Sequence, residues 1–422
     1  MSYWFTDPML KLMLPLMSSS SIKGLYSTFT TPTVFMGSNL LPEGPSIVPT
    51  PVDIIGARCP KKRAFLVTDE FAERYAARVA KALEKAGFAT QVWNKALPEA
   101  PMENVKESAE SMSQFEPDVI VAVGGGSVMD GAKAAWILYE RPDVTDLATL
   151  SPLTPLMLRK KAFLVAVPTT SGTGSECTSI AVVHDSDAHR KVPIACPELM
   201  PDFALLVPDF TVSMPPRLTV GTGLDVLAHA MDCVPTPASN EITDALALAS
   251  IEMVFKWLPR AYRNGQDREA RYRMLMAASM AGIAFGQSGA ALTHALGHSL
   301  GSIFNTHHGL TVGLFIPYIL QFYQPVTDKW LALGKALNVK GASREEIMVD
   351  LVKKVRALFA DLEVPLNLKD LGIPADEFDK NMERLVLYSC EDICHFFSPR
   401  PMTMDQCERI FRYAYEGKDV DF

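Results

Sequence analysis

The segment from Met274 to Thr327 contains no Asp, Glu, Lys or Arg, and it holds four of the chain's eight histidines. An apolar stretch of this length is long enough to cross a membrane. Glycines and polar residues such as Gln287, Thr293 and Asn305 interrupt it, however, and lipid-facing segments carry few polar groups. We therefore expect buried helices wrapped around a polar site, without a membrane.

The first half of the chain alternates short β-branched or aromatic runs with helical patterns. Single helices between strands indicate a parallel sheet with right-handed crossovers. The expected strands lie within 64–69, 90–94, 118–127 and 162–176, and the expected helices cover 70–85, end near 115 and begin near 128.

The second half is different, because after residues 213–219 the apolar pattern has a period of 3.6 residues and no strand is evident. The double proline at 215–216 predicts a boundary. We expect an α/β dinucleotide-binding domain over 1–214 and an all-helical metal-binding domain over 215–422, with the site in the cleft between them. Residues 1–28 lack the pattern of a signal peptide and are predicted to form an N-terminal arm.

Composition excludes one class of partner and suggests a compartment. Asp and Glu outnumber Lys and Arg by 48 to 40, so the chain has no basic footprint for nucleic acid. Seven scattered cysteines, an odd number, indicate a reduced cytoplasmic protein without a disulfide framework. Cys390 and Cys394, one helical turn apart before His395, are interpreted as core residues in preference to metal ligands.

Gly124-Gly125-Gly126-Ser127 stands where a strand meets a helix. Exposed backbone N–H groups and the positive helix end can cradle a phosphate there, although a tight turn explains the glycines equally well. Asp69 ends an earlier strand and could accept both hydroxyls of a ribose, and the hydroxyl-rich loop 169–175 ends a later one. These three features at one edge of a sheet favour a dinucleotide site, but not a G-x-G-x-x-G motif or a P-loop.

Asp225 and His229 stand four residues apart on a predicted helix and therefore share one face. Alone, such a pair is typical of a hydrogen bond. His294 and His298 have the same spacing, however, and His308 follows. Burying this many ionisable groups is costly unless they are paired or bind a metal, and one carboxylate with several imidazoles suits iron(II) or zinc.

Four motifs together resemble the iron-containing (type III) alcohol dehydrogenases. "GGGSVMDGAK" (124–133) is similar to the family's GGGSxxDxAK element, and "PTTSGTGSECT" (168–178) to its PTTxGTGSExT loop. "GLDVLAHAMD" and "HALGHSLGSIFNTHHG" resemble its two metal-binding segments. The resemblance runs in order from about Phe29 to the C-terminus.

The resemblance implies roles for individual residues, carried over position by position. Asp225, His229, His294 and His308 match the metal ligands, and His298 matches a non-ligand histidine of the active site. Asp69 matches the carboxylate that favours NAD over NADP, and Lys191 a lysine that reaches the cofactor ribose. The remaining implied cofactor contacts are Gly125, Gly126, Ser127, Asp130, Thr169, Thr170 and Thr178.

The chain departs from the family's pattern at several places. Residues 1–28 and 39–59 have no clear counterpart, and "LPEAP" (97–101) stands where many members have Asn-Pro. His307 occupies a position where a proline or another small residue is more usual. Cys390, His395 and Arg400 could shape a substrate pocket, and an ion-pair role for Arg400 stays open.

The function implied is hydride transfer between NAD(H) and a small primary alcohol or its aldehyde, with Fe2+, or Zn2+, polarising the substrate oxygen. His298 is the candidate for moving the hydroxyl proton. A homo-oligomer, dimeric or larger, is implied by the family. The rivals are a zinc glycerol-dehydrogenase-like or dehydroquinate-synthase-like enzyme, a metal-dependent hydrolase and a metal-storage scaffold. His229, the fourth candidate ligand, argues against the zinc enzymes, and the cofactor loops argue against the hydrolase and the scaffold.

Overall fold

The computed structural model describes Tyr3 and residues 6–9, 29–42, 46, 48–187 and 190–422. Most of the predicted N-terminal arm therefore lies outside the described residues. Two compact units contain Thr30–Ser213 and Met214–Phe422, respectively. The proposed domain boundary at 214/215 lies one residue from this division.

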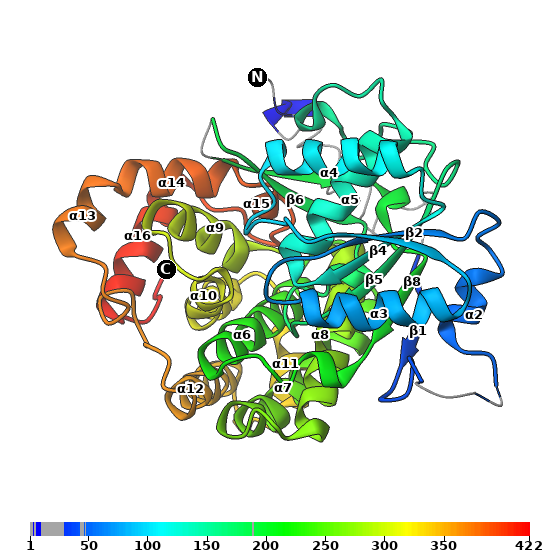
Figure 1. Cartoon of the computed structure of the whole chain (residues 1–422). Helices are drawn as coiled ribbons and strands as arrows, with labels where there is room; N and C mark the ends of the chain where they lie inside the picture. The colour runs from blue at the N-terminus through cyan, green and yellow to red at the C-terminus, as the bar shows by residue number, and fades with distance from the viewer. Residues whose placement is uncertain (1–2, 4–5, 10–28, 43–45, 47, 188–189) are drawn as a thin grey trace. The chain divides into compact units, whose positions relative to one another are not determined.

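The first unit contains a six-stranded parallel sheet with the strand order β1-β8-β5-β4-β2-β3 (Figure 1). All five pairings within it are parallel, as the alternation of strands and helices predicts. The strands are β1 (Thr33–Met36), β2 (Arg63–Val67), β3 (Ala89–Trp93), β4 (Val119–Gly124), β5 (Phe163–Pro168) and β8 (Phe203–Leu206).

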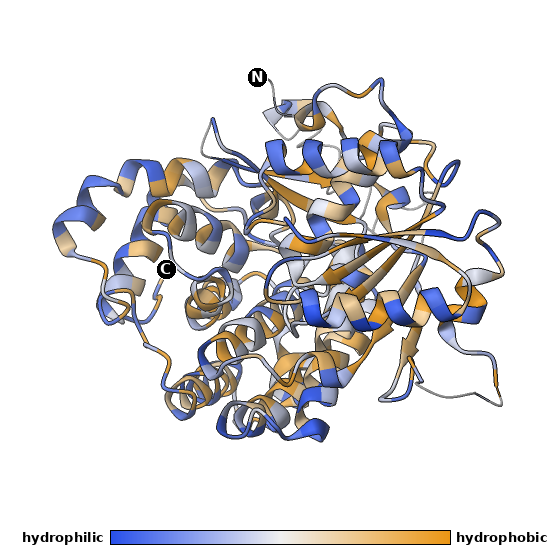
Figure 2. Cartoon of the chain, in the orientation of Figure 1, coloured by the Kyte–Doolittle hydropathy of each residue, from blue (hydrophilic) through white to orange (hydrophobic). Residues whose placement is uncertain are grey.

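Helices cover both faces of this sheet. α3 (Glu73–Lys85) lies on one face, where Val79 and Leu83 pack with Val121 of β4, and α4 (Met102–Phe115) and α5 (Gly126–Glu140) lie on the other (Figure 1). Figure 2 shows the corresponding pattern, with hydrophobic strands between helices whose outer faces are hydrophilic. Burial on both faces explains why β4 is apolar throughout.

An antiparallel hairpin of β6 (Ile180–Asp185) and β7 (Arg190–Ala195) was not predicted. Its strands mix buried with partly exposed residues, which weakens the apolar signal. The hairpin comes after the hydroxyl-rich loop in the sequence, and its strand β6 packs on α5. α3 begins at Glu73, three residues later than predicted.

The described residues of the second unit form helices joined by loops, without a strand, as the 3.6-residue period predicts. The helices that build the site are α6 (Pro216–Cys233), α9 (Leu292–Phe304) and α10 (His308–Tyr323). The other helices of this unit are α7 (Glu241–Arg263), α8 (Arg268–Ser288), α11 (Trp330–Ala336), α12 (Arg344–Asp361), α13 (Ala375–Lys380), α14 (Met382–Glu391), α15 (Ile393–Phe396) and α16 (Met404–Glu416), whereas α2 (Pro51–Gly56) belongs to the first unit.

α6 is the central helix of this unit, because every residue from Thr219 to Cys233 is buried. It starts at Pro216, since a proline is well placed in a first helical turn. Among the described residues, no single helix is both long and apolar enough to span a membrane. The pair α8 and α9 passes that test only jointly, with a bend of 104° between the two helices.

Candidate active site

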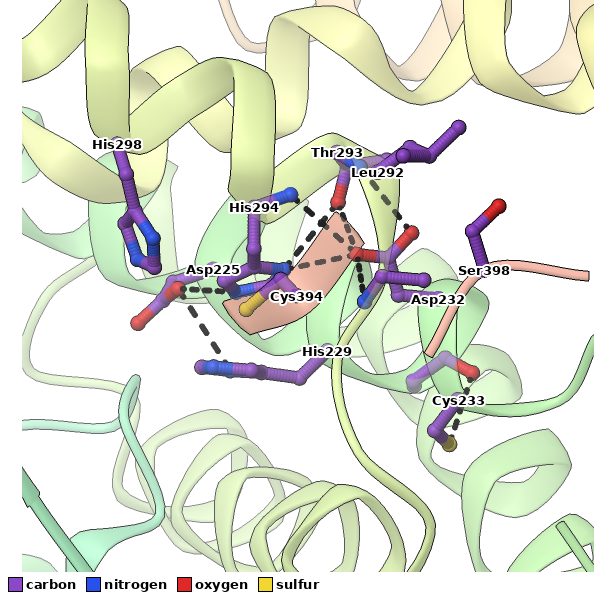
Figure 3. A network of polar contacts seen from close by, with 12 residues as sticks. Asp225, His229, Asp232, Cys233, Leu292, Thr293, His294, His298, Cys394 and Ser398 are labelled. Carbon is purple, nitrogen blue, oxygen red and sulfur yellow. Dashed lines mark hydrogen bonds and ion pairs between the residues drawn. The ribbon is translucent and has the colours of Figure 1, made fainter. Parts of the chain in front are cut away.

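The carboxylate of Asp225 is the point on which three histidines converge. Its Oδ1 lies 3.6 Å from His229 Nδ1, 3.8 Å from His294 Nε2 and 3.4 Å from His308 Nε2. α6 carries the Asp225–His229 pair, α9 carries His294, and α10 begins at His308 (Figure 3 shows the first three side chains). The sequence-predicted ligands are thus brought together from three helices.

Two glycines allow α6 and α10 to approach closely enough for this geometry. A Cβ added at Gly309 would lie 2.1 Å from Gly221 O and 2.8 Å from Asp225 Cβ. A Cβ at Gly221 would lie 2.4 Å from a ring carbon of His307. His307 therefore packs against α6 beside the site, and its backbone caps the start of α10.

The donors fit a divalent metal ion. Asp225 Oδ1, His229 Nδ1 and His294 Nε2 are buried without a hydrogen-bond partner among the described residues. The ligand atoms of Asp225, His294 and His308 lie within 4.8 Å of one another. His229 lies beside this trio, with its ring stacked on His294 at 4.4 Å and on Phe285 at 4.0 Å. Unpaired nitrogen and oxygen atoms in an apolar core are what an iron or zinc ion would satisfy.

The protonation of this cluster is set by burial and by the carboxylates. Burial alone would raise the pKa of Asp225, but the surrounding histidines hold it well below its usual range. Burial, opposed by Asp225, lowers the pKa of His229 to about 3, so this ring is neutral and can donate a lone pair. Burial would also lower the pKa of His294, but Asp225 and Asp232 raise it to about 9. A metal that binds His294 must therefore displace a proton.

Asp232 is a site residue that the sequence reasoning missed. Its Oδ2 accepts a hydrogen bond of 2.9 Å from His294 Nδ1 and one of 2.6 Å from Thr293 Oγ1, and Ala291 N donates at 2.8 Å (Figure 3). Carboxylates commonly hold the second ring nitrogen of a metal-binding histidine, which turns the other nitrogen toward the metal. The available signal was spacing, because Asp232 stands two turns beyond Asp225 on the same helix.

His298 lies one turn beyond His294 on α9 and does not belong to the Asp225 trio. Its ring stacks on that of His308 at 5.2 Å, and its Nδ1 is 2.9 Å from Asp392 Oδ2. His298, Asp392 and Cys394 also have donor atoms within 4.8 Å of one another, a spacing that would suit a metal. In this second trio, however, the His298 ring nitrogen already has Asp392 as its partner.

In the first unit, the glycine turn lies between β4 and α5, and the hydroxyl-rich loop packs on it. Thr169 N donates to Gly124 O at 2.9 Å, and a Cβ added at Gly126 would lie 2.6 Å from Thr173 Cγ2. Gly125 faces Thr170, whose side chain would be 3.4 Å from an added Cβ. Since β5, β4 and β2 are neighbours, Asp69 after β2 stands at the same edge of the sheet as both loops.

Other predicted cofactor residues bond within the protein. Asp130 accepts from Ser175 Oγ at 2.6 Å and from Val182 N at 3.0 Å, which ties α5 to the loop and the hairpin. Thr178 Oγ1 lies 3.1 Å from the Nζ of Lys133. Buried Lys133, which no function was predicted for, also donates to the carbonyls of Ser175, Thr178 and Ile180.

One departure from the family pattern, "LPEAP" (97–101), lies beside this turn. Glu99 N donates to Ser127 Oγ at 3.0 Å, and the Glu99 carboxylate is 3.1 Å from Lys191 Nζ. Ser127 and Lys191, both predicted to bind the cofactor, are therefore linked through a residue of "LPEAP". Asp69 Oδ1 accepts from Ala72 N at 2.7 Å, which orients that carboxylate.

The candidates near the C-terminus have structural partners. Arg400 donates to the carbonyls of Phe322 and Phe422, and its guanidinium lies 3.9 Å from the Phe322 ring centroid. His395 Nε2 accepts from Met402 N at 2.8 Å. Cys394 is buried and Cys390 is partly buried, and none of the seven cysteines, all of which are described, forms a disulfide.

In the comparison with known proteins, one family model matches the first unit and a second model matches the second unit. Residues 52–208 match the family model described as iron-containing alcohol dehydrogenase, and residues 219–415 match that of the C-terminal part of Fe-containing alcohol dehydrogenases. An NADPH-dependent butanol dehydrogenase of Clostridium saccharobutylicum is 34% identical over 81% of this chain and 87% of its own length. An aldehyde-alcohol dehydrogenase of Streptococcus pneumoniae is 32% identical, but the match spans only 40% of its length.

Solved structures show the same architecture. An iron-containing alcohol dehydrogenase from Thermococcus thioreducens is 27% identical with a TM-score of 0.81, over 93% of this chain and all of that one. A sulfoacetaldehyde reductase from Bifidobacterium kashiwanohense, solved in complex with NAD+, is 25% identical with a TM-score of 0.79, over 93% and 99% of the two chains.

Proposed function

The chain belongs to the iron-containing alcohol dehydrogenase family, and from this premise we propose that it interconverts a small primary alcohol and its aldehyde with NAD(H). The observation that carries the proposal is the convergence of three histidines on Asp225 Oδ1. That oxygen, His229 Nδ1 and His294 Nε2 are buried and have no hydrogen-bond partner among the described residues. Neither the polyol dehydrogenase nor the hydrolase alternative is favoured by these similarities.

Asp225, His229, His294 and His308 would hold the metal, iron(II) by family, while Asp232 keeps the His294 ring turned toward it. When bound, such an ion supplies Lewis acidity that lowers the pKa of an alcohol. His298 is partly exposed, with 24% of its side chain accessible, so it can pass a hydroxyl proton to solvent. A bound nicotinamide would supply the hydride chemistry at its C4, and positioning of the carbinol carbon against it would contribute much of the rate.

Cofactor binding is assigned to the edge of the sheet in the first unit. The turn at Gly125, Gly126 and Ser127 would take the pyrophosphate, with Thr169, Thr170 and Thr178 supplying or supporting hydroxyl contacts. Asp130 and Lys133 hold the loop that carries those hydroxyls. Asp69 supports NAD over NADP, because its carboxylate would repel the 2′-phosphate of NADP. One relative is nevertheless named as NADPH-dependent.

We also propose a cytoplasmic location and a homo-oligomer, dimeric or larger. The seven cysteines, none of which forms a disulfide, support a reducing compartment. The oligomer rests on the family resemblance alone, and light scattering coupled to size-exclusion chromatography would measure it.

Replacing His294 with Ala tests the proposed function. We expect loss of bound iron and of NADH-dependent aldehyde reduction, because the ring supplies a buried ligand. Metal analysis and an aldehyde screen with NADH measure these on one sample, and NADH binding serves as the control for an intact first unit. A variant that keeps both its iron and its activity would contradict the metal assignment.

A further inference from the structure

His294 and His298 stand one turn apart on α9, and each donates its Nδ1 proton to a carboxylate from another segment. For His294 the partner is Asp232, and for His298 it is Asp392, both at 2.9 Å. An ionised carboxylate can only accept hydrogen bonds, so the proton of each neutral ring must be on Nδ1. In the neutral form of each ring the lone pair is therefore on Nε2, a form that His294 reaches only after it loses its second proton.

Asp392 is itself held in one orientation. It lies between α14 and α15 with extended backbone angles (φ −63°, ψ 141°) and caps α15. Its Oδ1 accepts from Cys394 N at 2.8 Å, which leaves Oδ2 for His298. The two oxygens thus have separate roles, and the helix cap fixes the direction in which the second one points.

His298 is poised differently from the metal ligands. Its ring lies parallel to His308, with an interplanar angle of 18°, and edge-on to His294 at 5.8 Å, so it borders the metal cluster without entering it. Its side chain is partly exposed, whereas that of His294 is 3% exposed. A ring with a free Nε2, beside the cluster and in reach of solvent, has the requirements of a base that exchanges its proton with water.

We propose that Asp392 is a positioning residue, which holds His298 in the tautomer whose Nε2 accepts the hydroxyl proton of the alcohol. The proton leaves the substrate oxygen for Nε2 and passes from the imidazolium to water, while hydride goes to the nicotinamide. Asp392 stays ionised and stabilises the imidazolium. This assignment rests on the proposed function.

Asp392→Asn is the informative variant, because Asn remains a good helix cap but its amide can donate to Nδ1. The proton of the ring is then favoured on Nε2, and the base is lost. We expect kcat for alcohol oxidation to fall about 10- to 100-fold, with KM for NAD and bound metal unchanged. Asp146→Asn is the matched control, since Asp146 caps another short helix by accepting from Ala148 N at 2.9 Å.

A double-mutant cycle separates positioning from a merely structural role. If Asp392 acts through His298, Asp392→Asn should lower kcat little further when His298 is already Ala. A full additional loss in that background, or a normal kcat for Asp392→Asn alone, would overturn the proposal.

The tautomer can also be measured without any activity or variant. In zinc-loaded wild-type protein labelled with 15N-histidine, the His298 shifts should report a proton on Nδ1, and a proton on Nε2 would overturn the proposal. If the wild type shows no NAD-dependent alcohol oxidation, the proposed function fails, and the tautomer measurement still decides the role of Asp392.

Discussion

At the scale of single residues, Asp225 defines the chemistry of the site. Its side chain is 4% exposed, and its Oδ1 has three imidazoles within 3.8 Å but no hydrogen-bond donor within the described part of the chain. A buried carboxylate in such surroundings is costly unless a cation completes them. The residues around Asp225 are therefore better understood as a preformed cation site than as an ordinary polar core.

Asp69 allows a test of cofactor choice at the same scale. Asp69→Gly should raise the ratio of kcat/KM for NADPH to that for NADH by about tenfold, which corresponds to about 1.4 kcal/mol, because it removes the carboxylate that would face a 2′-phosphate. Steady-state kinetics with both cofactors measure the ratio. Glu70→Gln, which removes the neighbouring negative charge, is the control and should leave the ratio near the wild-type value. An unchanged ratio in Asp69→Gly would remove this residue from cofactor selection.

The sequence pointed to the residues that converge on Asp225, but not to those that orient them. The four-residue spacing of Asp225 and His229 defines a shared helix face, and the family motifs name His294 and His308. Asp232 and Asp392 could not be recognised as the partners of His294 and His298, because those contacts join distant segments. Only the packing of α9 against its neighbours reveals which carboxylate meets which ring.

At the scale of helices and strands, the contact of α6 with α10 depends on the absence of side chains. Gly309 follows His308 directly, and Gly221 precedes Asp225 by one turn, so the glycines lie beside the ligands that they bring together. The local sequence gives no reason for glycine inside α6 or α10, where it disfavours the helix. The close backbone approach explains its presence.

Gly309→Ala tests this contact. The added methyl would collide with Gly221 O, so we expect the free energy of unfolding to fall by about 1–3 kcal/mol and bound metal to decrease as His308 is displaced. Urea unfolding and metal analysis measure the two effects. Gly131→Ala in α5 is the control, because its new Cβ would make an ordinary contact of 3.5 Å with Ala100 and should not destabilise. A Gly309→Ala protein with normal stability and metal content would show that the helices need no such approach.

The elements that the sequence predicted are the ones with continuous apolar runs. β4 and β5 are buried along nearly all of their length, and such strands stand out in any sequence. β1 and β8 have only four residues each, and β7 includes Arg190 and Lys191, so their signals are weak. The strand order also could not be predicted, because it places the first strand beside the last one of the sheet.

At the scale of the whole molecule, our proposal assigns different tasks to the two units. The proposed cofactor residues belong to Thr30–Ser213, and the proposed metal ligands belong to Met214–Phe422. A metal that binds the folded second unit stabilises it in proportion to the logarithm of its concentration over Kd. Loss of the metal should therefore affect the two units unequally.

Metal removal tests this division. After chelation, we expect faster amide hydrogen exchange in α6, α9 and α10 and a lower Tm, with about 2.7 kcal/mol lost relative to protein held at 100 times Kd. Exchange in β4 and β5 should change little. Hydrogen exchange measured by mass spectrometry locates the effect, and re-addition of iron(II) under anaerobic conditions is the control. Equal deprotection of the sheet and the helices would contradict the separation of tasks.

The two carboxylates that bind the histidines of α9 affect how this enzyme can evolve. Asp232 lies on α6, the helix that also carries Asp225 and His229, whereas Asp392 lies between α14 and α15. Under our assignment, metal loading and proton handling are thus inherited through different stretches of sequence. Recombination between relatives could exchange the segment around Asp392 and so change kcat, while the resulting protein would still bind its metal.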